Sequence, residues 1–560
     1  MVFRRYAAWW LAALSVAYGS TSCAGETRFH QFTAKFKNTP DQAAVVAATY
    51  LGGKGTEWFA GGGFQPDGTV VAAGVSLGPA LDFAPQAVVL GTDTPAPPEP
   101  KPRQAVGKDG KPKVDKDGKP VLEPFKWTHE NATAFVVRFS PDLQQVVSVS
   151  RFPWRSGGVT SAAVDAEGCI YLAGPATDAI AALSGDCKEL PVPNSGQKDA
   201  PCSHIYLAKL SPDATKAVWV RHMRGPSCAP EVSVDKDGRL LLIGPDLRRL
   251  DAKGKLETAT LVPGGLGERV AANPVDGTFA RGGEHHWPTG REPYRDPILN
   301  IYKPDGTWLY ELYNWDGPFV GLDNLRLVSD TAVRGVRYDD DGNLILHCWS
   351  DGGNSVMYRQ PFDIRTEHKC QGLGFSGWGV GGAMSFAYVT KIETKGYKTV
   401  GGTLWCCFLM DKNKPNSIFI DGMSFASDGS VCLAGRAASG LIQTGNAIGL
   451  TRENTLKESN PQDPLVTGGP YVAVLNKECA SLRFCSGMPA CGKAEVNDAP
   501  WGVGRGVVNG RPRLLFLTGA VEQEDVYGRT YAAPTVKALQ RKFGGGCCDA
   551  YVLALDLGPK

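Results

Sequence analysis

The chain has 560 residues, with 59 basic and 57 acidic side chains and a formal net charge of +2 at neutral pH. No overall electrostatic field would recruit nucleic acid or an anionic membrane surface, so neither is expected as a general partner. At roughly 150 residues per domain, the length alone would allow three or four domains, but internal repeats indicate a different organisation.

The first 24 residues resemble a secretory signal peptide. Two arginines precede an apolar run at 6–18, small residues follow, and cleavage is expected after Gly19 or Ala24. The run is too short for a membrane span, and no other segment is long and apolar enough to be one. Cys23 raises lipidation as an alternative, but Ser20 stands where a bacterial lipobox prefers Leu. We therefore expect an exported protein, located in the periplasm, on the cell surface or outside the cell.

One phrase recurs along the chain and predicts a strand, a tight turn and a second strand. Its clearest copy is MSFASDGSVCLAG (423–435), in which apolar residues alternate before Asp428-Gly429 and an apolar run follows. Asp-Gly is a preferred hairpin turn because glycine adopts positive φ at little cost. There are seven copies in all. Their turn glycines are Gly68, Gly168, Gly238, Gly277, Gly342, Gly429 and Gly510.

A second phrase interleaves with the first and predicts the third strand of each unit. Examples are AFVVRFSPD (134–142), IYLAKLSPD (205–213) and AYVLALDLG (550–558), in which side chains alternate with period two. Repeats made only of short antiparallel strands are typical of a β-propeller. The sequence therefore predicts an all-β chain in which residues 25–560 form a single propeller with seven blades of four antiparallel strands.

Three stretches carry a family resemblance. YLGGKG (50–55), the seven AVDxxG-like hairpins, and APTVKALQRKFGGGCCDAYVLALDL (533–557) together resemble the SBBP class of bacterial β-propeller repeats. A unit of that class combines a D-A-F-V-x-K-L strand, a Y-L-G-G segment, an A-V-D-x-x-G-N hairpin and a connection that ends in three glycines. The resemblance is strong at both ends of the chain and loose in the middle, and it implies a propeller fold.

The two ends of the chain predict how the ring closes. The last unit contains two strands near 502–518 and a third strand at 550–557, but no fourth strand follows. QAAVVAATYL (42–51) has the composition of that missing strand. Pairing of the first and last segments would remove an open sheet edge, so we expect the terminal strands to close the ring.

The chain is longer than seven minimal blades of roughly 40 to 45 residues require. Equivalent connections in a four-stranded meander emerge on the same face, so insertions there elaborate one face, where binding usually occurs. The insertion at 95–120 is rich in Pro and Lys, which predicts a solvated loop, with a small β-hairpin or a contact arm as the alternative. The connections between second and third strands that hold the surplus are 75–133, 175–204, 284–298, 349–385, 436–470 and 520–549.

Loops on the elaborated face supply candidate ligand-binding residues. EHHWPTGREPYRDP (284–297) contains adjacent histidines, which can ligate a metal, and arginines, which can hold a carboxylate or phosphate. WSDGGN (349–354) and GLGFSGWGVGG (372–382) add tryptophans that can stack on a sugar or peptide. The alternatives are interblade salt bridges for the arginines and loop anchoring for the tryptophans. The candidates are His285, His286, Trp287, Arg291, Arg295, Trp349, Asp351 and Trp378.

Fifteen cysteines are many for an exported protein, and two pairs bracket loops that a disulfide could close: Cys187 with Cys202, and Cys485 with Cys491. There is no CxxC motif, so a zinc ribbon and covalent haem have no support. There is also no Walker, GxSxG or dinucleotide motif, and the Asp-rich turns lack the spacing of an EF-hand. We therefore expect no metal and no cofactor, and no catalytic residue is assigned.

Two classes of function remain. The favoured hypothesis is a monomeric secreted or periplasmic propeller that binds a protein or carbohydrate partner through its looped face without chemistry. The alternative is an enzyme, a hydrolase, lyase or oxidoreductase, with its active site at the mouth of the central channel. A tight cluster of polar loop residues with perturbed pKa values would favour an enzyme or a metal site, whereas dispersal would favour a binding scaffold.

Overall fold

Each of the seven repeated phrases forms the hairpin between the first and second strands of a sheet. All seven turn glycines adopt φ between +73° and +86°, a region that residues with a Cβ rarely occupy. In one copy the main-chain NH of Gly168 donates to the carbonyl of Asp165 at 3.0 Å, and in another the NH of Gly342 donates to the carbonyl of Asp339 at 3.0 Å. The prediction from the turn glycines is therefore confirmed.

The computed structural model describes residues 43–558 with gaps. The gaps are 79–80, 97–102, 105, 107–110, 115, 117, 124–130, 192–201, 227–228, 236, 245, 261–269, 287–294, 314–329, 352–356, 358, 368–369, 373–384, 410–413, 450–467, 493–500 and 525–529.

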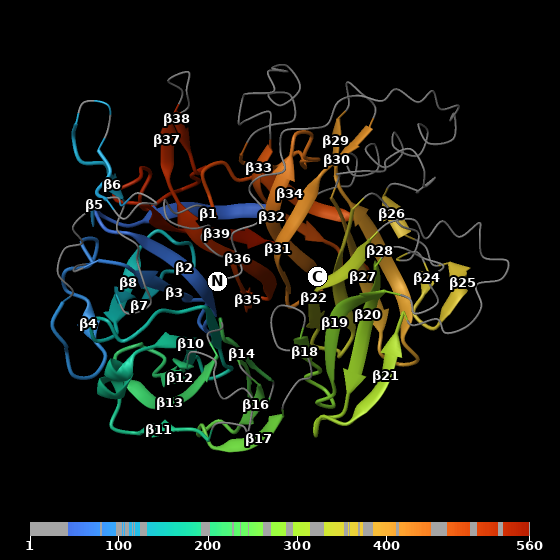
Figure 1. Ribbon diagram of the computed structural model, residues 1–560, viewed down its shortest axis with the longest axis horizontal. Coiled ribbons are helices and arrows are strands. Elements are labelled where there is room, and N and C mark those ends of the chain that lie inside the picture. The colour runs from blue at the N-terminus through green and yellow to red at the C-terminus, as the bar shows by residue number, and fades with distance from the viewer. Residues whose placement is uncertain are drawn as a thin grey trace.

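The strands assemble into seven antiparallel four-stranded blades arranged in a ring (Figure 1). The first strands, which lie innermost in blades 1 to 7, are β2 (Glu57–Phe64), β9 (Ser161–Val164), β14 (Glu231–Val234), β18 (Val270–Ala272), β22 (Thr331–Tyr338), β31 (Ile418–Phe425) and β35 (Gly502–Val508). The second strands are β3 (Val70–Ser76), β10 (Ile170–Ala176), β15 (Leu240–Ile243), β19 (Phe279–His286), β23 (Leu344–Ser350), β32 (Val431–Ala438) and β36 (Arg511–Ala520).

The outer half of each blade follows the same order. The third strands are β7 (Thr133–Phe139), β12 (Cys202–Leu210), β16 (Leu247–Leu250), β20 (Arg295–Tyr302), β27 (Phe386–Glu393), β33 (Gly468–Leu475) and β39 (Asp549–Asp556). The fourth strands are β8 (Val146–Arg151), β13 (Ala217–Pro226), β17 (Leu256–Thr260), β21 (Trp308–Leu312), β28 (Lys398–Trp405), β34 (Leu482–Gly487) and β1 (Ala44–Leu51). The all-β, seven-bladed prediction is therefore confirmed.

Blade 7 is built from both ends of the described chain. β1 pairs antiparallel with β39, in a register that runs from Ala44 opposite Asp556 to Leu51 opposite Ala550. β39 pairs in turn with β36, so the strand order is β1-β39-β36-β35. Figure 1 shows blue β1 beside red β39. The predicted closure by the terminal strands is confirmed. Because β1 covers β39, the last strand of the chain is paired on both of its edges.

Several of the second-to-third connections fold back over the outer edge of their own blade. In blade 7, Ala48 and Val536 exchange main-chain hydrogen bonds of 2.8 and 3.0 Å, and in blade 6 the NH of Thr444 donates to the carbonyl of Cys485 at 3.1 Å. In three other blades the insertion adds a parallel fifth strand, which covers unpaired edge groups. These strands are β4 (Val88–Val89) on β8, β11 (Cys187–Glu189) on β13 and β26 (Cys370–Gly372) on β28.

The insertions also form small elements of their own. The 3-10 helix η2 (Asp178–Leu183) buries Ile180 and Leu183. β5 and β6 pair across most of the Pro- and Lys-rich segment, so the described residues there form a small hairpin, which was the alternative to a loop. The short two-stranded sheets are β5 (Arg103–Gln104) with β6 (Leu122–Glu123), β24 (Arg359–Gln360) with β25 (Asp363–Glu367), β29 (Cys407–Leu409) with β30 (Lys414–Asn416), and β37 (Glu522–Glu524) with β38 (Thr530–Ala532).

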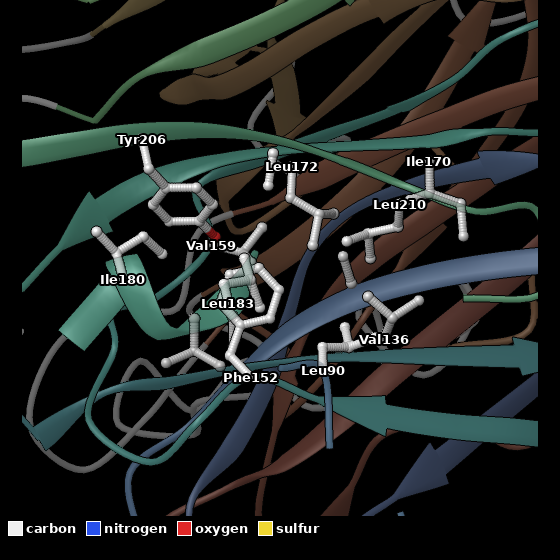
Figure 2. Packing of buried hydrophobic residues seen from close by; sticks show 14 of the residues in the cluster. Leu90, Val136, Phe152, Val159, Ile170, Leu172, Ile180, Leu183, Tyr206 and Leu210 are labelled. Carbon is white, nitrogen blue, oxygen red and sulfur yellow. The ribbon is translucent and has the colours of Figure 1, made fainter. Parts of the chain in front are cut away.

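The hydrophobic core consists of layers between neighbouring blades. Along β36, Leu514 and Phe516 pack against blade 6, whereas Leu515 and Leu517 pack against blade 1. Figure 2 shows the layer between blades 1 and 2, where side chains such as Tyr206 of blade 2 pack with residues of blade 1 and with η2. Because both faces of a blade are buried, second and third strands such as β3, β10 and β39 are apolar on both sides, which explains the continuous apolar runs of the sequence.

No helix in the described part of the chain combines the length and the hydrophobicity that a membrane span requires.

Candidate functional site

The structure describes three of the eight candidate ligand-binding residues with their side chains. Arg295 begins β20, Trp349 lies near the end of β23, and Asp351 follows that strand. All three lie where second strands end and third strands begin, which is the looped face. His285 and His286 end β19, where they pair with Asp296 and Arg295, but their side chains are outside the described part. Trp287, Arg291 and Trp378 lie outside the described residues.

Arg295 joins blade 4 to blade 5. Its Nε and Nη2 donate to Asp330 Oδ2 at 3.1 and 2.8 Å, and its main-chain NH donates to Asp330 Oδ1 at 2.8 Å. Its Nη1 also donates to Glu284 Oε1 of β19 at 3.1 Å. Charge-assisted hydrogen bonds of this kind hold the guanidinium in one orientation. Arg295 is therefore engaged by two carboxylates from neighbouring blades.

Arg334 of β22 extends the same network toward Trp349. Its Nη2 lies 3.1 Å from Glu284 Oε2, and its guanidinium carbon lies 5.4 Å from the centre of the Trp349 ring. A cation over an aromatic face is attracted by the ring quadrupole, with about 0.5–1 kcal/mol at exposed sites. Trp349 is half-buried, so part of this residue is exposed to solvent.

Two titratable groups beside this network have shifted pKa values. Burial, and then the charge of Arg334, lowers the pKa of His347 to about 3, so this buried imidazole is neutral at physiological pH. Burial, and then the charge of Asp330, raises the pKa of Asp351. Asp351 Oδ1 is buried and has no hydrogen-bond partner. The cluster thus combines satisfied ion pairs with one carboxyl group that holds its proton more strongly than usual.

The network is balanced in charge, because Glu284 and Asp330 offset Arg295 and Arg334. Interblade salt bridges were one of the two alternatives for Arg295, and the structure shows such bridges. The cluster can still present a mixed polar and aromatic surface, through Trp349 and the exposed parts of the arginines. Its role in ligand binding stays a prediction.

Three residues of the network were not among the candidates: Glu284, Asp330 and Arg334. Arg334 had a detectable signal, since it and Arg337 are the two cations of TAVRGVRY, a strand whose other residues are mostly apolar or small. A charge inside a strand that is buried on both faces needs a partner. Asp330 carries no such signal in the sequence, because acidic residues are common in loops just before strands.

Within the ring, ion pairs also join blades that are not neighbours. Arg337 Nη2 of blade 5 lies 3.2 Å from Glu231 Oε2 of blade 3, and both residues belong to innermost strands. Arg505 Nη1 of blade 7 lies 2.7 Å from Asp340 Oδ2 in the turn of blade 5, and its guanidinium carbon lies 4.3 Å from the centre of the Phe425 ring of blade 6. Charged side chains of different blades thus meet on the inner side of the ring.

The disulfide hypothesis gains no support among the described cysteines, which are all free thiols. Cys485 faces the core layer between blades 5 and 6, whereas Cys491 belongs to the layer between blades 6 and 7. The two side chains therefore lie on opposite sides of blade 6. Cys187 is also a free thiol, and the side chain of Cys202 is outside the described part. In the described part of the chain, no group of three or more His, Cys, Asp or Glu residues is arranged to hold a metal ion.

No protein-family model matches the chain, and no curated protein matches it. A crystal structure of a protein of unknown function from Dyadobacter fermentans DSM 18053 is similar at 11% identity, over 92% of this chain and 100% of that chain, with a TM-score of 0.35. The C-terminal WD40 domain of Sif2 is similar at 9% identity, over 87% of this chain and 98% of that domain, also with a TM-score of 0.35. A TM-score of 0.35 is too low to support a common fold, so the propeller assignment rests on the sheet topology of this chain.

Proposed function

We propose that this protein is an exported propeller of the SBBP type that binds a protein or carbohydrate partner through its looped face and does no chemistry. The observation that carries the proposal is the placement of the insertions, which leave the blades between the second and third strands and so share one face. Rigid blades that present varied loops are a common basis for binding. The export part of the proposal rests on the N-terminal residues alone.

The clustering and the shifted pKa values of His347 and Asp351 meet the criterion given above for an enzyme or a metal site, whereas the pairing of the charged groups in the blade 4–5 network supports recognition. Its two arginines are each held by a carboxylate, and His347 is a buried neutral group. Trp349 offers an aromatic face next to Arg334, which suits a sugar ring or a peptide side chain. Such a surface gives selectivity without a nucleophile.

Binding can be tested by screening the purified full chain against glycan and peptide arrays, followed by calorimetry on the best ligand. The variant Trp349→Ala should weaken binding at least tenfold, because it removes the aromatic face of the looped surface. Trp308→Ala is the matched control, since Trp308 is 56% exposed but lies on outermost strand β21. Equal affinities for the wild type and the Trp349 variant would contradict this assignment of the binding face.

The enzyme alternative has one specific observation in its favour, the carboxyl group of Asp351. Its raised pKa and its unpartnered oxygen next to Asp330 are what a general acid requires. A screen of glycosides and esters with the wild type and with Asp351→Asn separates the two functions. Turnover that is lost in the variant while binding persists would replace the binding hypothesis with an enzymatic one.

Export can be tested by expressing the full chain in a bacterial host and measuring the mass of the mature N-terminus. Cleavage after Gly19 or Ala24 supports export, whereas a retained N-terminus in the cytoplasmic fraction contradicts it.

A further inference from the structure

Two fully buried carboxyl groups meet where blade 7 joins blade 1. Glu57 is the first residue of β2 and Asp549 the first of β39, and both are 0% exposed. The main chain brings them together, because the NH of Glu57 donates to the carbonyl of Cys548 at 2.9 Å. Burial, and then the charge of Asp549, raises the pKa of Glu57 to about 8, while burial raises the pKa of Asp549 to about 7.

Each of these carboxyl groups has one oxygen without a hydrogen-bond donor. Asp549 Oδ2 accepts from Gln540 Nε2 at 2.8 Å and from the NH of Gly544 at 2.7 Å, whereas Asp549 Oδ1 has no partner. The carboxyl group of Glu57 interacts with the main-chain NH of Gly53 and accepts a long hydrogen bond from Ser76 Oγ to Oε1 at 3.5 Å, whereas its Oε2 has no partner in hydrogen-bond geometry. Unpaired carboxylate oxygens at complete burial are expensive unless a proton or a cation neutralises them.

In the described part of the chain, no Lys, Arg or His side chain forms a salt bridge with either carboxyl group. Tyr50 and Cys548, two weak acids, lie close enough to Asp549 for its charge to raise their pKa values. Asp82 Oδ2 accepts from the main-chain NH of Lys54 at 3.1 Å. The surroundings of the pair therefore favour a bound positive charge.

The glycine-rich loop beside the pair is shaped to make room for these carboxyl groups. A Cβ on Gly52 would lie 2.3 Å from Asp549 Oδ1, and a Cβ on Gly55 would lie 2.2 Å from Glu57 Oε1. Real Cβ atoms do not approach other atoms so closely, so a side chain at either position would force the neighbouring carboxyl group to move. The carbonyl oxygens of Gly52 and Gly53 face Gly544, next to Asp549. Carbonyl oxygens of the loop before β2 thus lie close to the main chain that donates to Asp549.

We propose that Glu57 and Asp549 bind one hard divalent cation of the Ca²⁺ class at this seam between blades 7 and 1. Oxygen ligands are what Ca²⁺ prefers, and its flexible geometry accepts main-chain carbonyls and water beside carboxylates, whereas Mg²⁺ requires a near-octahedral shell. Since no third His, Cys, Asp or Glu side chain in the described residues completes a metal group, those carbonyls and waters would supply the rest of the shell. A cation here would tie the loop before β2 to β39 and so stabilise the ring closure.

The experiment compares denaturant unfolding of the full chain in EDTA and in millimolar CaCl₂, at pH 6 and pH 8.5, with calorimetric titration of Ca²⁺. Calcium should raise the unfolding midpoint, and the rise should be larger at pH 8.5, because protons compete with the metal for both carboxyl groups. In EDTA, stability should fall as pH rises from about 4.5 to about 8, since in that range the folded state keeps a proton on Glu57 that the unfolded chain has lost.

Glu57→Gln and Asp549→Asn preserve size and remove charge, so each should weaken Ca²⁺ binding at least tenfold. Each should also be at least as stable as the wild type in EDTA at pH 8.5, because no buried charge then forms. Asp237→Asn, at an exposed turn carboxylate, is the matched control and should behave as the wild type. A wild-type protein with no calcium response and no binding heat would show that the pair holds protons only, which overturns the proposal. A calcium response that persists in both variants would place the metal elsewhere and overturn it equally.

Discussion

At the scale of single residues, the turn glycines contribute through backbone conformation more than through contacts. Gly510 adopts φ +75°, and a Cβ built on it meets nothing within 4 Å, so a substitution there tests the dihedral angle alone. A glycine with positive φ occurs in the turn of each of the seven hairpins. Local chemistry therefore carries much of the information that specifies this repeat.

Gly510→Ala should lower the free energy of unfolding by about 1–2 kcal/mol, because an L side chain at positive φ is strained. Gly445→Ala serves as its control, since Gly445 is also exposed and uncrowded but has no positive φ. Its effect should stay within about 0.5 kcal/mol. Urea titrations of both variants provide the measurement, and equal effects at the two sites would show that the turn conformation is not what requires glycine.

At the scale of elements, the insertions protect edges as well as decorating a face. In three blades the insertion adds a parallel fifth strand. In two more blades, main-chain hydrogen bonds hold the insertion against the outermost strand. Among the described residues, β17 and β21 in blades 3 and 4 have no such cover. Bare outer strands are sites where foreign strands can pair, so edge protection is a physical reason for long insertions.

Deletion of residues 549–560 should abolish cooperative unfolding. It removes β39, which pairs with both β1 and β36, so blade 7 would lose its third strand and release its fourth. Deletion of 559–560 alone leaves β39 complete and should preserve the wild-type midpoint. Far-UV circular dichroism during denaturant titration is the measurement. A protein without 549–560 that unfolds at the wild-type midpoint would contradict closure by the terminal strands.

At the scale of the whole molecule, the ring has no end from which unfolding can begin independently. Each blade is packed between two others, and ion pairs such as Glu231 with Arg337 join blades that are not neighbours. Open repeat arrays depend on nearest neighbours and can lose cooperativity along their length. In a closed ring, a substitution that destabilises one blade should instead lower the free energy of unfolding of the whole ring.

Ile301→Ala in blade 4 and Leu517→Ala in blade 7 should therefore destabilise the same single transition. Both side chains are fully buried, and truncation to alanine costs about 2–5 kcal/mol. Tryptophan fluorescence and far-UV circular dichroism should report coincident unfolding curves for each variant. Separate transitions, with only one shifted by each substitution, would indicate blades that unfold on their own.

The sequence by itself determined the local structure of this protein and, through repetition, its global fold. Turn glycines and alternating strands act over a few residues, so seven hairpins, four strands per blade and the fourth strand at 42–51 were all predictable. The same reasoning identified Arg295, Trp349 and Asp351 as residues of one face.

Only the tertiary structure decided which side chains meet. Asp330 and Arg334 complete the network around Arg295 because blade 5 packs on blade 4, and Glu57 faces Asp549 because the ring closes. Cys485 and Cys491, close in sequence, are separated by the sheet between them. Contacts between blades depend on the relative placement of rigid sheets, and no local pattern of residues encodes that placement.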